Sequence, residues 1–301
     1  MASAGAELAV AESGNADRPT VLLVHGYPDT KAVWDEVADE LAGSLHVVRY
    51  DVRGSGGSSA PRRTGEYRLD RLIGDLAAVA DAASPGRPVH LVGHDWGSTQ
   101  AWAALSDRRL AGRIASFTSI SGPCLEHAGS WVRRRLRRPS PRALRQLLGQ
   151  ALRSWYLVVF AIPGFAELAW RRVLARTWPQ TLARLEGISP RPGHPADTLL
   201  RDATNGLSIY RANLPAAGRP RRAARTAVPV QLIVPTRDAY VSPALAADDV
   251  DRFAPDLVRR EVVAGHWVIR SHAKTVARWI EAFVAQREPS IAPRSLAEAA
   301  A

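Results

Sequence analysis

The residues best suited to chemistry centre on Asp95, in the segment Gly93-His94-Asp95-Trp96-Gly97. An apolar run precedes this segment and a helix-like run follows it, which predicts a strand, a sharp turn and a helix. The two glycines fit a turn that is too tight for larger side chains beside a reactive residue. A helix-capping aspartate is the alternative interpretation, and the partners of Asp95 further along the chain argue against it.

An aspartate nucleophile restricts the reaction that such a turn can support. Attack by a carboxylate on an sp3 carbon gives an alkyl ester, and water can then attack the ester carbonyl. A serine would form an ether, which has no carbonyl for water to attack, and attack by Asp95 on an acyl carbon would give an anhydride. Asp95 therefore favours displacement at carbon, with an epoxide oxygen or a halide as the leaving group.

Two further residues complete a candidate catalytic set. Asp238 follows an apolar run at 228–234, and His266 follows another at 257–263. Open α/β sheets place their sites at such strand ends, so we predict that His266 activates water and that Asp238 orients it. A turn aspartate and a surface histidine are the alternatives for each residue alone. The backbone N–H groups of Tyr27 and Trp96 are predicted to form the oxyanion hole.

These residues require a scaffold that alternates strands and helices. The apolar pattern predicts an α/β fold with a mostly parallel sheet flanked by helices on both faces. The strands are expected at 7–11, 19–25, 45–51, 89–94, 114–120, 228–234 and 257–263. Helices are expected around 33–41 and at 69–83, 243–253 and 271–286.

The alternation is interrupted once. Residues 123–218 contain helical stretches, arginines and prolines but no convincing strand, so they are interpreted as an inserted helical cap. Residues 1–122 and 219–287 would then form one discontinuous core. The Pro-, Ser- and Ala-rich tail, 288–301, is predicted to be disordered.

Composition sets further bounds. The chain has 301 residues, of which 46% are hydrophobic and 23% charged, as in globular proteins. No signal peptide or membrane-spanning run is visible, so a cytoplasmic location is expected. The single cysteine, Cys124, excludes an internal disulfide and a cysteine zinc cluster, and we read it as a small apolar residue. Neither a metal nor a cofactor is expected.

The formal net charge of +11 comes almost entirely from arginine. We attribute it to coding bias, and no nucleic-acid-binding motif accompanies it, so nucleic acid is not expected as a partner. One arginine cluster has two interpretations, a solvated helix face, which we favour, or weak contact with a membrane surface that would make the protein peripheral to the membrane. This cluster comprises Arg133, Arg134, Arg135, Arg137 and Arg138.

The motifs together resemble the epoxide hydrolases of the α/β-hydrolase fold over nearly the whole chain. They are His25-Gly26-Tyr27-Pro28, Asp51-Val52-Arg53-Gly54, the segment around Asp95, the Asp238 loop and Gly265-His266-Trp267. Haloalkane dehalogenases share much of this set. Segments around Tyr156 and Tyr210 look like those carrying two cap tyrosines that donate to the epoxide oxygen. A departing halide needs no such proton, so the tyrosines favour the epoxide hydrolases.

The resemblance implies a small hydrophobic epoxide as substrate and leaves the oligomeric state open. The chain looks most like the hydrolase half of actinobacterial proteins that fuse an epoxide hydrolase to a short-chain dehydrogenase. No dinucleotide fingerprint follows a strand, so no NAD(P) role is carried over. Haloalkane dehalogenase and a lipid-associated binding module are the alternatives. His25 is expected to fix its loop, His94 to be structural and Asp29 to cap a helix.

Overall fold

The computed structural model describes residues 1–3, 5–217 and 225–288. Seven strands form one sheet in the order β3-β5-β4-β6-β7-β8-β9, in which β3 is antiparallel to β5 and every other pair is parallel. The sheet strands have these bounds: β3 Val10–Ser13, β4 Thr20–Val24, β5 His46–Tyr50, β6 Val89–His94, β7 Ile114–Ile120, β8 Val230–Pro235 and β9 Leu257–Val262. A separate pair consists of β1 Ala2–Ser3 and β2 Ala6–Glu7.

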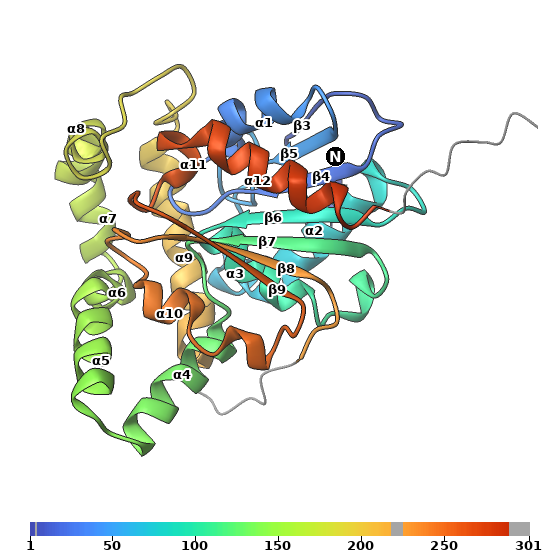
Figure 1. Ribbon diagram of the computed structural model, residues 1–301. Helices are drawn as coiled ribbons and strands as arrows, with labels where there is room; N and C mark the ends of the chain where they lie inside the picture. The colour runs from blue at the N-terminus through green and yellow to red at the C-terminus, as the bar shows by residue number, and fades with distance from the viewer. Residues whose placement is uncertain (4, 218–224, 289–301) are drawn as a thin grey trace, which may run out of the picture.

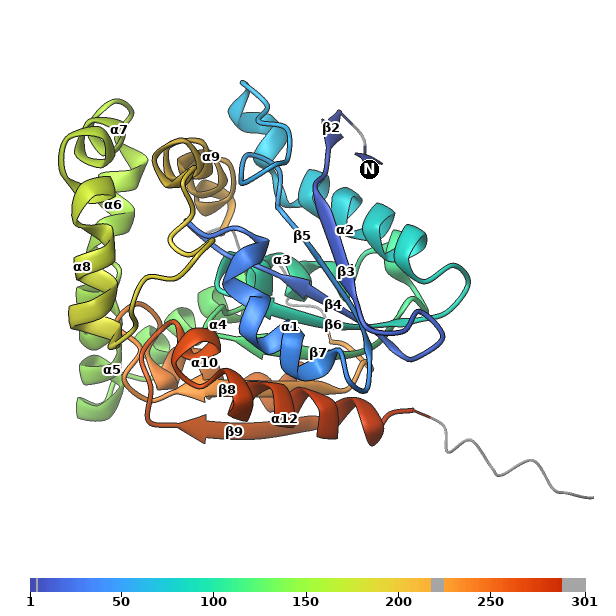
Figure 2. The same cartoon turned by 90° about the horizontal axis from the view of Figure 1, so that it is seen from above.

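Successive side chains along each strand point to opposite faces of the sheet, so the core is divided into two layers. In β4, Val21 and Leu23 face one cluster of buried residues, whereas Leu22 and Val24 face the other. Helices α1 and α12 cover the first face of the sheet, and α2 and α3 cover the second (Figures 1 and 2). The helices of this part are η1 Lys31–Trp34, α1 Asp35–Leu41, η2 Thr64–Tyr67, α2 Leu69–Ala83, α3 Trp96–Ala104, η3 Arg108–Leu110, α10 Pro243–Ala247, η5 Val250–Arg252, α11 Val268–Ser271 and α12 Ala273–Ala285.

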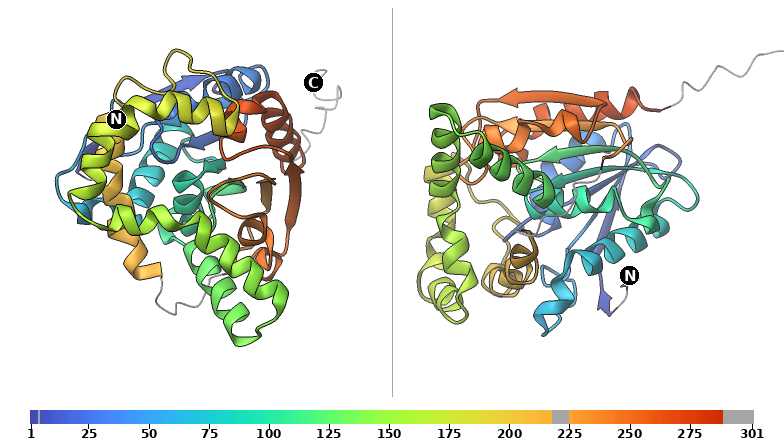
Figure 3. Two further views of the ribbon diagram at one scale, coloured as in Figure 1. Left: turned by 90° about the vertical axis from the view of Figure 1, so that its left-hand side faces the viewer. Right: turned by 90° about the horizontal axis from the view of Figure 1, so that it is seen from below.

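A set of helices, here called the cap, lies between β7 and β8 in the chain. Its members are α4 Leu125–Arg137, α5 Pro141–Arg153, α6 Trp155–Ala161, α7 Phe165–Ala169, the π-helical turn η4 Trp170–Leu174, α8 Ala175–Glu186 and α9 Leu199–Ala217. Helices α5 to α8 stand along one side of the molecule, beyond the carboxyl ends of the parallel strands (Figures 1 and 3). None of the described helices is both long and apolar enough to cross a membrane.

Two expected elements differ from the structure. The edge strand expected at 7–11 is β3, Val10–Ser13, and the helix expected at 243–253 is broken between α10 and η5. Helix α10 ends at Ala247 because Asp248 has an extended backbone with a ψ of 134°, and Asp249, whose φ of 69° is left-handed, precedes η5. The side chains of Asp248–Asp249 instead pair with arginines of α4. Of the tail predicted to be disordered, 289–301 lies outside the described residues.

Candidate active site

Three side chains from distant loops meet at the carboxyl edge of the sheet. Asp95 follows β6, Asp238 follows β8 and His266 follows β9. The Nδ1–H of His266 donates to Oδ2 of Asp238 over 2.9 Å, while its Nε2 lies 3.9 Å from Oδ1 of Asp95. The second distance is too long for a direct hydrogen bond. The fold thus brings together the three residues named from the sequence, with His266 between the two carboxylates.

Asp95 occupies a strained turn between β6 and α3. Its φ of 52° and ψ of −122° are conformations that residues with side chains rarely adopt. Neighbouring backbone approaches this turn closely, since a Cβ on Gly97 would lie 2.1 Å from the carbonyl oxygen of Val24. A Cβ on Gly26 would lie 2.4 Å from Oδ2 of Asp95. Both positions therefore require glycine if the carboxylate is to sit where it does.

Two backbone amides face the carboxylate of Asp95. The N–H of Tyr27 donates to Oδ2 over 2.8 Å, and the N–H of Trp96 acts with it to lower the pKa of this carboxylate. Burial raises the pKa of Asp95 to about 6, although the charge of His266 and the two amides act to lower that pKa. Asp95 is therefore mostly ionised at neutral pH, and two donors are already in place to stabilise negative charge.

Asp238 stays charged although it is buried. Burial by itself would raise its pKa, but the charge and hydrogen bond of His266 lower the pKa below the ordinary range. The N–H groups of Tyr240 and Val241 add to this effect by donating to Oδ1 over 2.8 and 2.9 Å. With both oxygens engaged, the carboxylate fixes the orientation of the imidazole.

His266 is surrounded by negative charge. Burial would lower the pKa of its imidazole, but the carboxylates of Asp238, Asp95 and Glu186 outweigh burial and raise that pKa to about 9. A reaction that converts Asp95 into a neutral ester removes one of these charges. The pKa of His266 then falls, and more of the imidazole takes the neutral form that can accept a proton from water.

The two candidate tyrosines border the same cavity as Asp95 and His266. Tyr156 lies on α6 and Tyr210 on α9, and the cavity has a volume of about 480 Å³. Their rings meet edge to face, with centroids 6.3 Å apart. Burial is the main cause that raises the pKa of both phenols above the ordinary value. Both phenols are therefore protonated at neutral pH and able to donate a hydrogen bond into the cavity.

Two residues beside His266, Tyr240 and Glu186, were not predicted from the sequence. The ring centroid of Tyr240 lies 4.9 Å from that of His266 and 5.6 Å from that of Tyr156. Its position two residues after Asp238 is the signal that could have revealed it. Glu186 ends α8, and one of its oxygens accepts a hydrogen bond from the N–H of Trp267 over 3.1 Å. No local motif marks Glu186, because it belongs to a different part of the chain.

The helix-capping role expected for Asp29 is wrong. The hydroxyl of Thr30 caps η1, whereas the buried Asp29 accepts hydrogen bonds from Nε1 of Trp267 at 2.8 Å and from Nε2 of His194 at 3.0 Å. Burial would raise the pKa of Asp29, but the side chains of His194 and Trp267 lower it. Asp29 thus links the loop after His266 to the chain between α8 and α9.

His25 and His94 have the structural positions expected of them. Nδ1–H of His25 donates to the carbonyl of Gly26 over 2.8 Å, and its Nε2 accepts from the N–H of Val52 over 2.9 Å. His94 is fully buried, and its Nε2–H donates to the carbonyl of His266 over 3.0 Å. Burial lowers the pKa of His94 to about 4, so its ring is neutral at neutral pH.

The arginine cluster of α4 is divided between two environments. Arg134 and Arg135 form ion pairs of 3.0 and 2.6 Å with Asp248–Asp249 and so join the cap to the loop after α10. These two arginines are therefore partly used in a contact within the molecule. The remaining three, Arg133, Arg137 and Arg138, line a basic surface pocket of about 350 Å³ together with Arg252, and Arg134 borders the same pocket.

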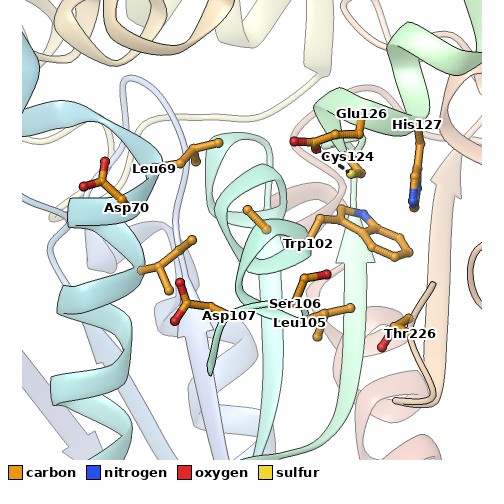
Figure 4. A pocket seen from close by; sticks show the side chains of 12 residues that line it. Leu69, Asp70, Trp102, Leu105, Ser106, Asp107, Cys124, Glu126, His127 and Thr226 are labelled. Atoms are coloured by element: carbon orange, nitrogen blue, oxygen red, sulfur yellow. Dashed lines mark hydrogen bonds between the residues drawn. The ribbon is translucent and has the colours of Figure 1, made fainter. Parts of the chain in front are cut away.

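A second cavity, of about 270 Å³, lies beside α3 and the start of α4 (Figure 4). Cys124 lines it, and its thiol donates to Oε2 of Glu126 over 3.2 Å. Burial, with the charge of Glu126, raises the pKa of this thiol far above the ordinary value. Cys124 therefore remains a neutral, protonated thiol, consistent with the small apolar residue that was expected.

These features occur together in one known family. A model of the α/β hydrolase fold matches residues 19–273, and the chain belongs to the α/β-hydrolase fold family. The fold class predicted from the sequence is thereby confirmed, as is the resemblance to epoxide hydrolases, which recur among the relatives and the solved structures.

Two relatives come from Mycobacterium tuberculosis. The chain is 39% identical over 287 residues to "Probable oxidoreductase EphD", covering 93% of this chain and 48% of that protein. It is 33% identical over 182 residues to "Epoxide hydrolase A", covering 60% of this chain and 52% of that protein. The chain thus spans about half the length of the curated relatives it matches.

Solved structures of similar fold include two epoxide hydrolases. That of Bacillus megaterium aligns with a TM-score of 0.76 at 20% identity, covering 95% of this chain and 99% of the other. VrEH1 of Vigna radiata aligns with a TM-score of 0.72 at 25% identity, covering 94% and 95%. Because the cap is included in such coverage, the likeness extends beyond the sheet and its flanking helices.

Proposed function

We propose that this protein is an epoxide hydrolase that converts a small hydrophobic epoxide to a vicinal diol. One observation carries the proposal, namely that Asp95, His266, Tyr156 and Tyr210 border a single cavity with mainly apolar walls. A nucleophile, a base and two proton donors are the groups that this reaction needs. The relatives named as epoxide hydrolases support the same conclusion.

In the first step, Asp95 attacks one carbon of the epoxide ring. The attacking atom is Oδ1, because Oδ2 accepts the hydrogen bond of the Tyr27 amide. A C–O bond forms to Asp95 as the ring C–O bond breaks, and its electron pair goes to the ring oxygen. Tyr156 and Tyr210 hydrogen-bond this oxygen, and one phenol supplies the proton that makes it a hydroxyl group.

In the second step, water cleaves the ester. Nε2 of His266 takes a proton from a water molecule, whose oxygen attacks the carbonyl carbon of the ester. The amides of Tyr27 and Trp96 stabilise the oxyanion that forms. When the tetrahedral intermediate collapses, the C–O bond to the substrate breaks and the leaving oxygen takes the proton of the hydroxyl group that came from water, which restores the carboxylate of Asp95. The proton held by His266 then returns to the phenolate, so the imidazole and the phenol are restored as well. Asp238 holds the imidazole in the orientation that this step requires.

The helical segment is assigned to substrate binding. We propose that residues 1–122 and 219–287 form the core and that 123–218 form the cap, with the catalytic cavity at their junction. The helices α4 to α9, which supply both tyrosines, support this division. The boundary between 218 and 219 lies outside the described residues.

A turnover screen tests the proposed activity. Aryl, terminal alkyl and fatty-acyl epoxides are compared with haloalkanes, and diol and halide are both measured. We expect diol from epoxides and a near-complete loss of turnover in Asp95→Asn. Halide release without diol formation would replace the proposal with haloalkane dehalogenase, which the same nucleophile can support.

A further inference from the structure

An unbroken apolar stripe runs along the outer surface of α5 and α6. Its members are spaced by three or four residues, which places them on one side of the helices. Each exposes between 49% and 69% of its surface. They are Leu144, Leu148, Leu152, Trp155, Val158 and Ile162.

The stripe faces away from the sheet. Helices α5, α6, α7 and α8 stand side by side in the outermost layer of the molecule, and this layer faces the viewer in the left panel of Figure 3. Phe165 and Leu168 of α7 extend the exposed apolar surface beyond α6. A contiguous exposed apolar surface of this kind marks an interaction site rather than ordinary surface variation.

The charge around the stripe is strongly positive. Residues 125–186 contain twelve arginines but only three acidic residues, Glu126, Glu167 and Glu186. Glu167 is paired with Arg211, and Glu186 is engaged with the loop of His266. Eight exposed arginines of the cap form no ion pair with a described residue: Arg137, Arg138, Arg142, Arg145, Arg171, Arg172, Arg176 and Arg184.

The apolar surface is continuous with the catalytic cavity. Trp155, Phe165 and Leu185 each line that cavity, and each also exposes more than half of its surface to solvent. A molecule held against the outer face of α6 and α7 therefore has an apolar route toward Asp95.

We propose that this outer face of the cap docks on an anionic lipid bilayer. The stripe would enter the boundary between headgroups and acyl chains, while the unpaired arginines contact lipid phosphates. Charge complementarity selects this partner over a second copy of the chain, because two such faces would repel each other. A further part, resting on the proposed function, is that apolar epoxides pass from the bilayer past Trp155 into the cavity.

Vesicle sedimentation tests the docking without any substrate. The whole chain is mixed with vesicles of phosphatidylcholine alone or with phosphatidylglycerol added, over a series of salt concentrations. We expect binding to the anionic vesicles that weakens as salt rises, because surface electrostatics are screened. No binding to anionic vesicles at low salt overturns the proposal.

Matched variants locate the surface. Leu148→Glu and Arg145→Glu change exposed residues of α5, and we expect each to weaken binding by roughly tenfold or more. Val263→Glu and Arg278→Glu make the same changes on exposed residues of the core and should bind as the unchanged protein does. Equal losses in both pairs, or none in either, overturn the assignment to the cap.

Two further outcomes are distinguishable. If light scattering finds a dimer that Leu148→Glu dissociates, the face belongs to a second copy and the lipid proposal is wrong.

For substrate entry, Leu148→Glu should lower turnover of a long-chain epoxide embedded in vesicles but not of a short epoxide in water. Loss of both activities contradicts lipid entry, whereas docking without any epoxide turnover contradicts only the proposed function.

Discussion

Glu186 of the cap and Trp267 of the core are joined by a hydrogen bond of 3.1 Å, from the backbone N–H of Trp267 to a carboxylate oxygen. The backbone N–H of His266 also acts to lower the pKa of this carboxylate. The contact is close because Gly265 has no side chain, and a Cβ there would lie 2.2 Å from the same oxygen. The cap thus holds the loop of His266 and places a third negative charge near its imidazole.

The first prediction concerns this charge. Glu186→Gln keeps an oxygen that can accept from Trp267 but removes one of the charges that raise the pKa of His266. The pKa of His266 should fall, so the neutral imidazole persists at lower pH. The acid limb of the pH profile of kcat should therefore move to lower pH.

The control is Glu281→Gln, which removes an exposed charge from α12 and should leave the profile unchanged. A lower rate in Glu186→Gln with an unmoved acid limb would restrict Glu186 to holding the loop.

The second prediction follows the oxygen of water into Asp95. If water attacks the ester carbonyl, a single turnover in ¹⁸O-labelled water with enzyme in excess should leave the diol unlabelled. The label should then be found in the peptide that contains Asp95, as measured by mass spectrometry after digestion. Label in the diol after one turnover would mean that water attacks the epoxide directly.

The third prediction separates the two chemical steps. His266→Gln should form the ester but not hydrolyse it, because attack by Asp95 needs no base whereas attack by water does. Intact mass spectrometry after mixing with epoxide should show the protein plus one substrate. Lost turnover without an adduct would place His266 in ring opening instead.

The fourth prediction tests the tyrosines. Tyr156→Phe and Tyr210→Phe keep the rings but remove the donors, and general-acid assistance is typically worth about 10²–10⁴-fold in rate. Single variants should lose less than this because the partner phenol can still donate. The double variant should lose more than either, with the defect confined to ester formation in single-turnover kinetics. An unchanged rate of ester formation in the double variant would make both residues packing aromatics and favour the dehalogenase.

The fifth prediction concerns Asp29. Asparagine has only one acceptor oxygen, so it cannot accept hydrogen bonds from Trp267 and His194 on two separate oxygens. We therefore expect Asp29→Asn to lower the free energy of unfolding by about 1–3 kcal/mol at pH 7. The folded state lowers the pKa of Asp29, so its charge stabilises the fold above its ordinary pKa. This contribution is lost as pH falls through the folded pKa, below about pH 4. Urea unfolding should show that the free energies of unfolding of the unchanged protein and of Asp29→Asn converge in this acidic range. A difference between them that stays constant with pH would contradict this account.

Much of the site could be predicted from the sequence because its signals are local. Asp95, Asp238 and His266 each follow an apolar run that forms a strand, and the strands are parallel. Parallel strands carry their carboxyl ends to one edge of the sheet, so three separate local patterns were sufficient to bring the three residues together. The strands at 89–94 and 114–120 were predicted with their observed bounds because the apolar run that marks each strand is also a local signal.

The contacts between cap and core required the tertiary structure. Glu186 lies 80 residues before His266, and Asp29 lies 165 residues before His194, so no spacing rule connects either pair. The stripe from Leu144 to Ile162 has the period of an amphipathic helix, which by itself indicates burial against a core. Only the packing of the cap decides which side of α5 and α6 is covered. Local sequence fixes the period of a pattern, whereas the direction it faces depends on every element packed around it.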